Sequence, residues 1–413
     1  MLFHKKLKPR FFLTHLLLLL PWYIHAADKR YAKPTAKQEP TEKVFLFDRY
    51  WSPCATASLL MSARTFLNGI KSWPQTGQAQ QKLWVRIFDV LVELLIINEQ
   101  LRLFNHEVYG HGFRIRSLGG RVADYRFTLF EGAATCWNPW PGITADEFLL
   151  IHMAGTEANY VLAQEIALRH FKYRKLDNST YNLFFTASWD LMNYISLTHR
   201  SEIIRNHPGN DVMNYIKMIN NKHQLDGISL DDLNDASIVF LLNPMFYAYL
   251  WSVYVYLAKG QREISIPHLQ WDEIAYMPLL RMALTPFGIA YYLDNYLGNP
   301  AKTFLISLYT GSSPFYTSYY GGLACKTDRL WSYKSYALDL EGNLWYQPPL
   351  QLAPADALGD KNYWGGLVGF TNKFQITPQL SLYVAALYKT QGFVEGVVAA
   401  GGFMGRAGFS LHY

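Results

Sequence analysis

The stretch 364–388, WGGLVGFTNKFQITPQLSLYVAALY, indicates two antiparallel strands in the C-terminal part of the chain. Its apolar residues fall on alternate positions, first at Trp364, Val368, Phe370, Phe374 and Ile376 and then at Leu382, Val384, Ala386 and Tyr388. Such alternation is the pattern of a strand with one apolar face, and Thr377-Pro378 supplies a turn. The residues from 301 to 413 share this texture, so we expect an antiparallel β-rich, barrel-like domain of roughly six to eight short strands.

The chain ends with Gly-Phe-Ser-Leu-His-Tyr, an alternating segment whose last residue is the aromatic Tyr413. This segment resembles the closing strand of outer-membrane β-barrel proteins. The resemblance implies an outer-membrane barrel whose last strand ends at Tyr413. A soluble antiparallel sheet shows the same alternation, so the pattern leaves both possibilities open.

Upstream of residue 300 the pattern is helical. Between 83 and 105 apolar residues recur at spacings of three and four, which predicts a long, mostly buried helix. Thr144 and Glu147 form a capping box, so a second helix should begin there and run to about residue 170. Further helices are expected near 181–199, 209–221, 236–259 and 276–297. The fold class is therefore α+β, with a mainly helical, catalytic-type domain over 45–300 followed by the β domain over 301–413.

The first 27 residues have the parts of a secretory signal peptide: a basic start, an apolar run from Phe11 to Leu20, and small residues at Ala26 and Ala27. Residues 28–44 are rich in Lys, Pro, Gln and Thr and should form a flexible leader. Export would place the protein in the periplasm or the outer membrane. Cleavage removes four cations and leaves 34 basic against 32 acidic residues, a balance that argues against nucleic acid as a partner.

Aromatic residues make up 16% of the chain, with 29 Tyr and 12 Trp, and charged residues make up only 17%. This composition suits contact with a membrane interface, although a carbohydrate-binding surface would share it. Ile238–Leu257 is nearly uncharged and long enough to be a candidate membrane span. Because Asn243 and Pro244 lie within it, we favour a buried core helix there and expect membrane association through the β domain.

The segment with the clearest chemistry is 105–112, NHEVYGHG, at the end of the long helix. Two imidazoles beside a carboxylate suit a metal hydrolase, since imidazoles bind the ion and a glutamate accepts a proton from metal-bound water. On a regular helix His106 and His111 would lie ~140° apart. They can share one ion if the helix widens into a π-bulge or ends at Gly110. Alternatively Glu107 and His111 are the ligand pair, or Gly110 marks an ordinary helix end without a metal.

The arrangement His-Glu-x-x-x-His, with Gly on both sides of the second His, resembles the motif of TldD/PmbA-type metallopeptidases. The resemblance implies that His106 and His111 bind a zinc ion and that Glu107 is the catalytic base. It is confined to this segment, and the acidic residue that follows the motif in those proteins is replaced here by Phe113-Arg114. Those proteins are also cytoplasmic, so the similarity is one of local chemistry and does not extend to family membership.

A third metal ligand is expected from the second predicted helix. Glu157 is the first choice because it lies in the stretch 154–158, AGTEA, whose small residues would let another helix approach closely. His152 and Glu165 are the alternatives. A buried salt bridge is the competing explanation for Glu157, with one of three arginines, Arg102, Arg114 or Arg116.

These features predict an exported zinc metallopeptidase that acts on a peptide or protein substrate. The substrate would pair through its backbone with the strand-like segment 121–135. Two other classes stay open. One is a non-enzymatic envelope β protein, and the other is a membrane-embedded metalloprotease.

Overall fold

The computed structural model describes residues 42–72, 82–129, 132–299, 301–312, 314–315, 319–353 and 361–412. The predicted signal peptide, residues 28–41 of the predicted leader, and Tyr413 lie outside these ranges. The last residues assigned to the leader, 42–44, belong to the first strand, β1 (Glu42–Asp48).

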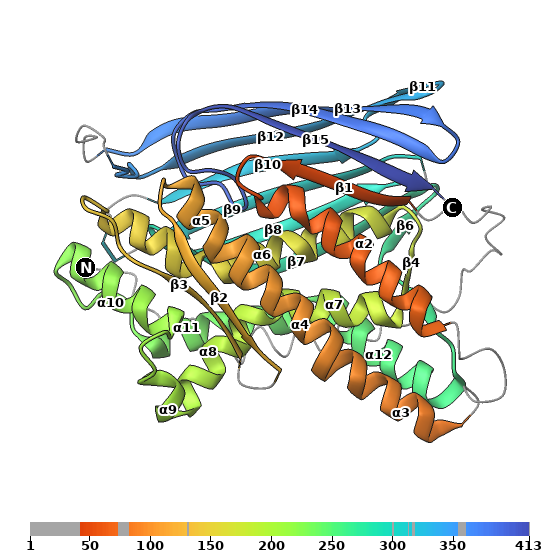
Figure 1. Ribbon diagram of the computed structural model, residues 1–413, viewed down its shortest axis with the longest axis horizontal. Helices are drawn as coiled ribbons and strands as arrows, with labels where there is room; N and C mark the ends of the chain where they lie inside the picture. The colour runs from red at the N-terminus through yellow and green to blue at the C-terminus, as the bar shows by residue number, and fades with distance from the viewer. Residues whose placement is uncertain are drawn as a thin grey trace.

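The N-terminal part of the described chain is mainly helical (Figure 1). The α-helices are α2 (Pro53–Ser72), α3 (Leu83–Val92), α4 (Asn98–Phe104), α5 (Gly112–Ser117), α6 (Ala145–Phe171), α7 (Asn178–Ser188), α8 (Asp190–Arg200), α9 (Glu202–Arg205), α10 (Asp211–His223), α11 (Leu230–Ser237) and α12 (Pro244–Lys259). Two π-helical segments, η3 (Glu93–Ile97) and η4 (Asn105–His111), and one 3₁₀ segment, η5 (Ile238–Leu242), connect some of them.

The strands form one large antiparallel sheet and two small hairpins. The large sheet contains β1, β6 (Leu269–Trp271), β7 (Ile274–Thr285), β8 (Gly288–Gly298), β9 (Thr303–Ser312), β10 (Tyr320–Asp328), β11 (Trp331–Tyr333), β12 (Tyr336–Gln347), β13 (Tyr363–Thr377), β14 (Leu380–Lys389) and β15 (Gly402–His412). Its order is β1-β15-β14-β13-β12-β10-β9-β8-β7-β6, with β11 paired to β12. The small hairpins are β2 (Val122–Thr128) with β3 (Gly132–Trp137), and β4 (Lys175–Asp177) with β5 (Glu263–Ser265).

The expected combination of a helical N-terminal part and an antiparallel sheet is confirmed, but the sheet is not a closed barrel. Within the described residues, the edge strands β1 and β6 do not pair with each other. The sheet also draws strands from both ends of the chain, because β1 pairs along its whole length with β15. Helices cover one face of the sheet (Figure 1).

The helix expected over 276–297 is wrong, since these residues form the β7–β8 hairpin. The sequence of β8 shows no alternation of apolar and polar residues, because both of its faces carry apolar or aromatic side chains. Tyr292 and Tyr296 point inward and are buried, whereas Tyr291 and Leu293 on the other face are exposed. A strand that is apolar on both faces cannot be distinguished from a buried helix by periodicity alone.

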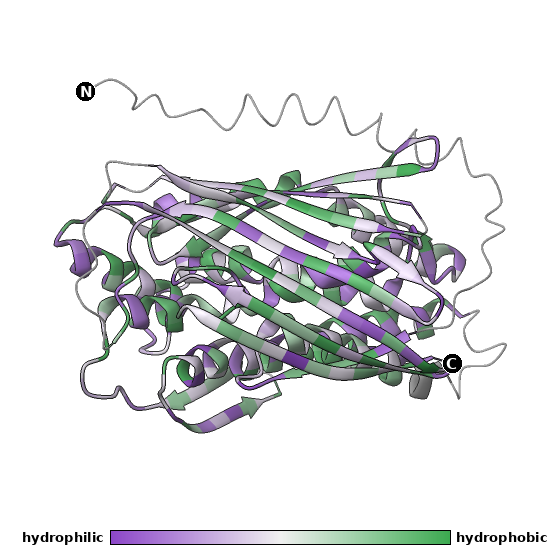
Figure 2. Cartoon of the chain, turned by 90° about the horizontal axis from the view of Figure 1, so that it is seen from above, coloured by the Kyte–Doolittle hydropathy of each residue, from purple (hydrophilic) through white to green (hydrophobic). Residues whose placement is uncertain are grey.

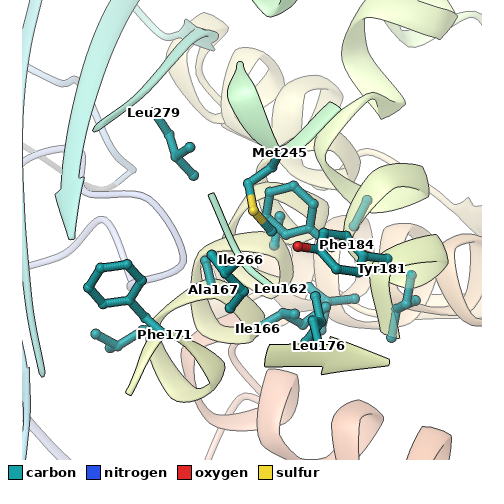
Figure 3. Close-up of a cluster of buried hydrophobic side chains, with 14 of the residues drawn as sticks. Leu162, Ile166, Ala167, Phe171, Leu176, Tyr181, Phe184, Met245, Ile266 and Leu279 are labelled. Carbon is teal, nitrogen blue, oxygen red and sulfur yellow. The ribbon is translucent and has the colours of Figure 1, made fainter. Parts of the chain in front are cut away.

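Helix α6 lies against the sheet and packs on β7, β8 and β9, and other helices pack around it. The predicted capping box is present, since Thr144 and Glu147 each bond the other's backbone N–H. A buried apolar cluster joins this helix to its neighbours, with Leu162, Ile166 and Phe171 of α6 facing Met245 of α12 and Leu279 of β7 (Figure 3). Full burial of each such side chain is worth about 1.5–3 kcal/mol, so α6 anchors the helical layer on the sheet.

The outer face of the large sheet carries exposed apolar side chains, unlike the solvent-facing side of a soluble sheet. On β14, the residues of one parity are buried on the inner face (Ser381, Tyr383, Ala385, Leu387 and Lys389), whereas Leu382, Val384, Ala386 and Tyr388 on the outer face are exposed. Neighbouring strands pair four exposed leucines into one row, Leu293, Leu308, Leu323 and Leu344. Figure 2 views this outer face and shows apolar residues spread across the strands. The residues whose alternation predicted the strands thus share a face, but that face points away from the protein.

The candidate membrane span at 238–257 is divided by the structure into η5 and α12. Among the described residues no single helix is both long and apolar enough to cross a membrane. Leu230–Leu242 and Pro244–Lys259, which are bent by 62°, reach that length and composition only when they are taken together. Helix α12 is also less buried than a core helix, because Leu250, Trp251 and Tyr254 are exposed.

Candidate metal centre

The two motif histidines lie side by side because the helix widens at this point. Segment η4 is a π-helix that continues without a break from α4 into α5. The rings of His106 and His111 are 5.0 Å apart between centroids, at an angle of 64°. The predicted π-type distortion is therefore confirmed, and the helix does not stop at Gly110.

Asp211, the first residue of α10, completes the group. Its Oδ2 lies 3.1 Å from His111 Nε2 and 3.5 Å from His106 Nε2. One ligand atom from each of the three residues lies within 4.8 Å of the other two, which is compatible with a single metal ion. Sequence reasoning misses this role, because an aspartate that follows the helix-capping Asn210 is explained equally well by the helix dipole.

The far nitrogens of both rings are held by the protein. His106 Nδ1 lies 3.0 Å from Asp190 Oδ2, and His111 Nδ1 lies 2.7 Å from the carbonyl oxygen of Ile151. Because a carbonyl can only accept, His111 Nδ1 carries a proton, which leaves Nε2 as the ring nitrogen that a metal ion could bind. Asp190 is itself fixed by Arg102 and by Asn159 Nδ2, 2.8 Å away. Such partners orient histidine ligands in metal sites.

Glycines bring the two site helices unusually close. A Cβ atom on Gly155 of α6 would lie 2.2 Å from His106 Nε2, and one on Gly110 would lie 2.6 Å from the carbonyl oxygen of Ala154. Both distances are too short for any side chain. The small residues predicted to allow close approach therefore do so, and the space they leave is filled by the imidazole of His106.

The charges of the group are mutually stabilised. Burial alone would lower the pKa of His106, but the Asp190 carboxylate raises it to about 10. Burial likewise opposes the effect of Asp211, which raises the pKa of His111. Although burial would raise the pKa of Asp211, the facing His111 holds it well below its usual range. The site thus concentrates negative charge around two imidazoles, an environment that favours a cation between them.

Glu157, expected as the third ligand, does not join this group. Its carboxylate forms a salt bridge with Arg114 and accepts a 2.5 Å hydrogen bond from the backbone N–H of Gly396. The competing salt-bridge explanation is the one that the structure supports. Glu157 is two residues beyond Gly155, so it points about 200° around α6 from the face that meets His106.

The two alternative ligands have different surroundings. His152, one turn before Gly155, places Nδ1 3.5 Å from Asp211 Oδ1, the oxygen that does not face His111. Glu165 instead pairs with Arg169 at 2.5 Å. His152 is therefore at the edge of the metal group and can orient the Asp211 carboxylate.

Glu107 lies beside the histidines and is buried. The hydroxyl of Thr135 lies 2.7 Å from Glu107 Oε2 and 3.0 Å from the Glu107 carbonyl oxygen. Thr135 belongs to β3, so the predicted strand segment 121–135 forms a hairpin that reaches the site. On the other side, the backbone N–H of Asp211 donates to Tyr194 Oη at 3.0 Å, and the Tyr194 ring is 6.4 Å from that of His106.

No protein-family model matches the chain, and no curated protein matches it. A solved structure of the porin NanC is similar over 36% of this chain and 76% of the porin chain, with 13% identity and a TM-score of 0.25. This TM-score is too low to show a common fold.

Proposed function

We propose that the protein is a membrane-embedded metalloprotease whose metal ion is bound by His106, His111 and Asp211. The observation that carries the proposal is the convergence of both Nε2 atoms on Asp211 Oδ2 while both Nδ1 atoms are engaged behind them. Two imidazoles and one carboxylate are a donor set that zinc commonly takes in hydrolases, where a fourth position is left for water.

Glu107 is the proposed general base. A zinc ion at this site would supply a polarised water or substrate carbonyl. Glu107 adjoins His106 in the chain, and its carboxylate can accept the proton that such a water loses. The Thr135 hydroxyl orients that carboxylate from β3. A buried, fixed base of this kind contributes about 10²–10⁴-fold to the rate of hydrolysis.

A peptide or protein is the proposed substrate because of the β2–β3 hairpin. The hairpin is two-stranded in the described residues, so each strand has an edge that no other described strand occupies. An extended peptide that pairs with the edge of β3 would run next to Thr135 and therefore next to Glu107.

The outer face of the sheet supports a membrane location. Strands β7 to β10 and β12 to β15 each have between 9 and 15 residues, and a membrane-crossing strand needs roughly 9–11. Apolar side chains on the outside and ion pairs such as Arg281–Asp294 on the inside fit a sheet surrounded by lipid. With the predicted signal peptide, this favours the outer membrane.

The test compares three variants of the full chain, purified in detergent and supplied with zinc. Glu107→Gln should retain the metal and lose hydrolysis of a casein-like substrate by about 10²–10⁴-fold. His111→Ala should lose both. Glu263→Gln, at an exposed position in β5, is the matched control and should keep both. Wild-type protein that binds no divalent ion under these conditions would end the proposal.

A second candidate function is a non-enzymatic envelope protein in which the metal is structural. It is favoured by burial, since His106, Glu107 and His111 are each only 5–6% exposed, and structural zinc sites are closed to solvent. In that case Glu107→Gln would bind metal like the wild type, and neither protein would hydrolyse the substrate.

A further inference from the structure

The distribution of side chains on α3 and η3 is inverted relative to a soluble helix. The charged residues Arg86, Asp89 and Glu93 point into the protein and are at most 9% exposed. The residues that point outward are large and apolar, and they are between 42% and 66% exposed: Leu83, Trp84, Ile87, Phe88, Leu91 and Leu95. A soluble surface helix places its charges outward and its apolar stripe inward.

Two of the three inward charges, Glu93 and Asp89, have partners inside the protein. Glu93 forms a salt bridge with Arg64 of α2 and accepts a hydrogen bond of 3.3 Å from Asn98 Nδ2. Asp89 accepts a hydrogen bond from Tyr256 Oη of α12. Ionisable groups of helices in lipid behave in this way, facing the protein interior and pairing with one another. Both inward carboxylates are therefore paired inside the protein, and the outer face of α3 and η3 is left for an apolar medium.

Helix α12 extends this apolar surface. It packs against α3 and contains no acidic residue, and Leu250, Trp251 and Tyr254 on its outer side are about half exposed. In Leu83–Ile97 and Pro244–Lys259, which are described throughout, no carboxylate is exposed. Each helix rises about 22–24 Å over its 15 or 16 residues, close to the ~25 Å apolar band of outer-membrane proteins.

At one end of the α3–α12 pair, two exposed lysines lie where a membrane surface with anionic headgroups would be. Lys82, just before α3, and Lys259, at the end of α12, are both exposed. They lie at the same end, because Gly260, which follows α12, is next to the guanidinium of Arg86. Exposed Lys side chains beside Trp84 are the combination found where a helix meets anionic headgroups.

We infer that α3, η3 and α12 form a second lipid-contacting surface, and that its occupant is the hydrocarbon of the bilayer in which the sheet lies. In Figure 1 the pair α3–α12 lies on the side of the molecule away from the strands β10 to β15. A protein bound to one membrane surface needs one apolar face. Two apolar faces on remote sides of the molecule are both covered when lipid surrounds it. The inference rests on the membrane location proposed above and is independent of hydrolysis at the metal centre.

The test is the accessibility of single spin labels on the full chain in vesicles of phosphatidylethanolamine and phosphatidylglycerol. Cys54, Cys136 and Cys325 are first replaced by alanine, and a circular dichroism spectrum equal to that of the wild type verifies that the background folds. Single cysteines are then placed by Phe88→Cys and Trp251→Cys in the helix pair, Leu382→Cys in the sheet, and Ile203→Cys in α9, where Ile203 is 87% exposed.

Labels at 88 and 251 should be reached by oxygen, which enriches in hydrocarbon, several-fold more than by a water-soluble nickel complex. The label at 203 should show the opposite order. Access of the nickel complex to 88 and 251 overturns the inference, and so does exclusion of both reagents, which would indicate a protein partner. The label at 382 tests the sheet alone. If the nickel complex reaches 382, the sheet does not lie in lipid; if it reaches 88 and 251 but not 382, only the helix pair lies outside the lipid.

Discussion

At the scale of single residues, the metal centre depends on groups that the sequence reveals to different degrees. His106, Glu107 and His111 are recognisable because three such side chains within one apolar helix need a common explanation. Asp211 is not recognisable, since it lies 100 residues beyond His111 and has the ordinary position of a helix-dipole charge. Asp190 is equally hidden, although it determines the orientation of His106.

Protons and a metal ion compete for the two Nε2 atoms, which gives the site a defined pH dependence. Without metal, the folded protein holds a proton on His106 with a pKa of about 10, above the ~6.5 of an unfolded histidine. The stability from this proton is complete below pH ~6.5 and is lost as the pH rises through about 10. Metal binding has the opposite trend, because the ion must displace protons.

We therefore expect zinc binding to release protons at pH 7 and its apparent affinity to rise between pH 6 and pH 8. Calorimetric titrations in buffers of different ionisation enthalpy measure the number of protons released. Asp190→Asn, which removes the carboxylate that raises the pKa of His106, should reduce that number. An affinity that is constant over this pH range would contradict zinc binding through the two imidazoles.

At the scale of elements, periodicity predicted where many helices and strands occur but not which way they face. The parity of Val368 and Phe370 correctly placed them on one face of β13, and the spacing of residues 83–105 correctly gave a helix. The expectation that the latter is mostly buried is wrong for its first half, because a periodic pattern fixes which residues share a face and leaves open whether protein or lipid covers that face.

The close packing of η4 against α6 can be disturbed by a single substitution. Gly155→Ala would place a methyl group 2.2 Å from His106 Nε2, so the ring or the helices must shift. Overpacking of this kind costs about 1–3 kcal/mol. We expect lower thermal stability and substoichiometric zinc, measured by plasma mass spectrometry.

Gly405→Ala in β15 is the control for this substitution, since the nearest atom to its Cβ would be 3.9 Å away. That variant should bind zinc like the wild type. Full zinc content in Gly155→Ala would show that His106 does not contribute Nε2 to the ion from this position.

At the scale of the whole molecule, the metal group joins elements that the chain brings together from far apart. His106 and His111 belong to the long helix, Asp211 begins α10, and the ring of His111 is held by α6 through Ile151. The sheet, by contrast, is held by its own ladder, in which β1 pairs with β15 and the remaining strands follow as antiparallel neighbours. Metal binding should therefore stabilise the helical layer selectively.

Removal of the metal tests whether the ion stabilises the helical layer and not the sheet. A ligand present at 1,000 times its dissociation constant stabilises the state that binds it by about 4 kcal/mol. In hydrogen exchange followed by mass spectrometry, chelation should increase exchange in Asn105–His111 and in Asp211–His223, since both segments lose their common ligand. Exchange in Tyr363–Thr377 and Leu380–Lys389 should stay unchanged, because these strands bond mainly to each other and to their sheet neighbours. Equal loss of protection in the strands would mean that the metal governs the entire fold, and no change at Asp211–His223 would mean that Asp211 is not a ligand.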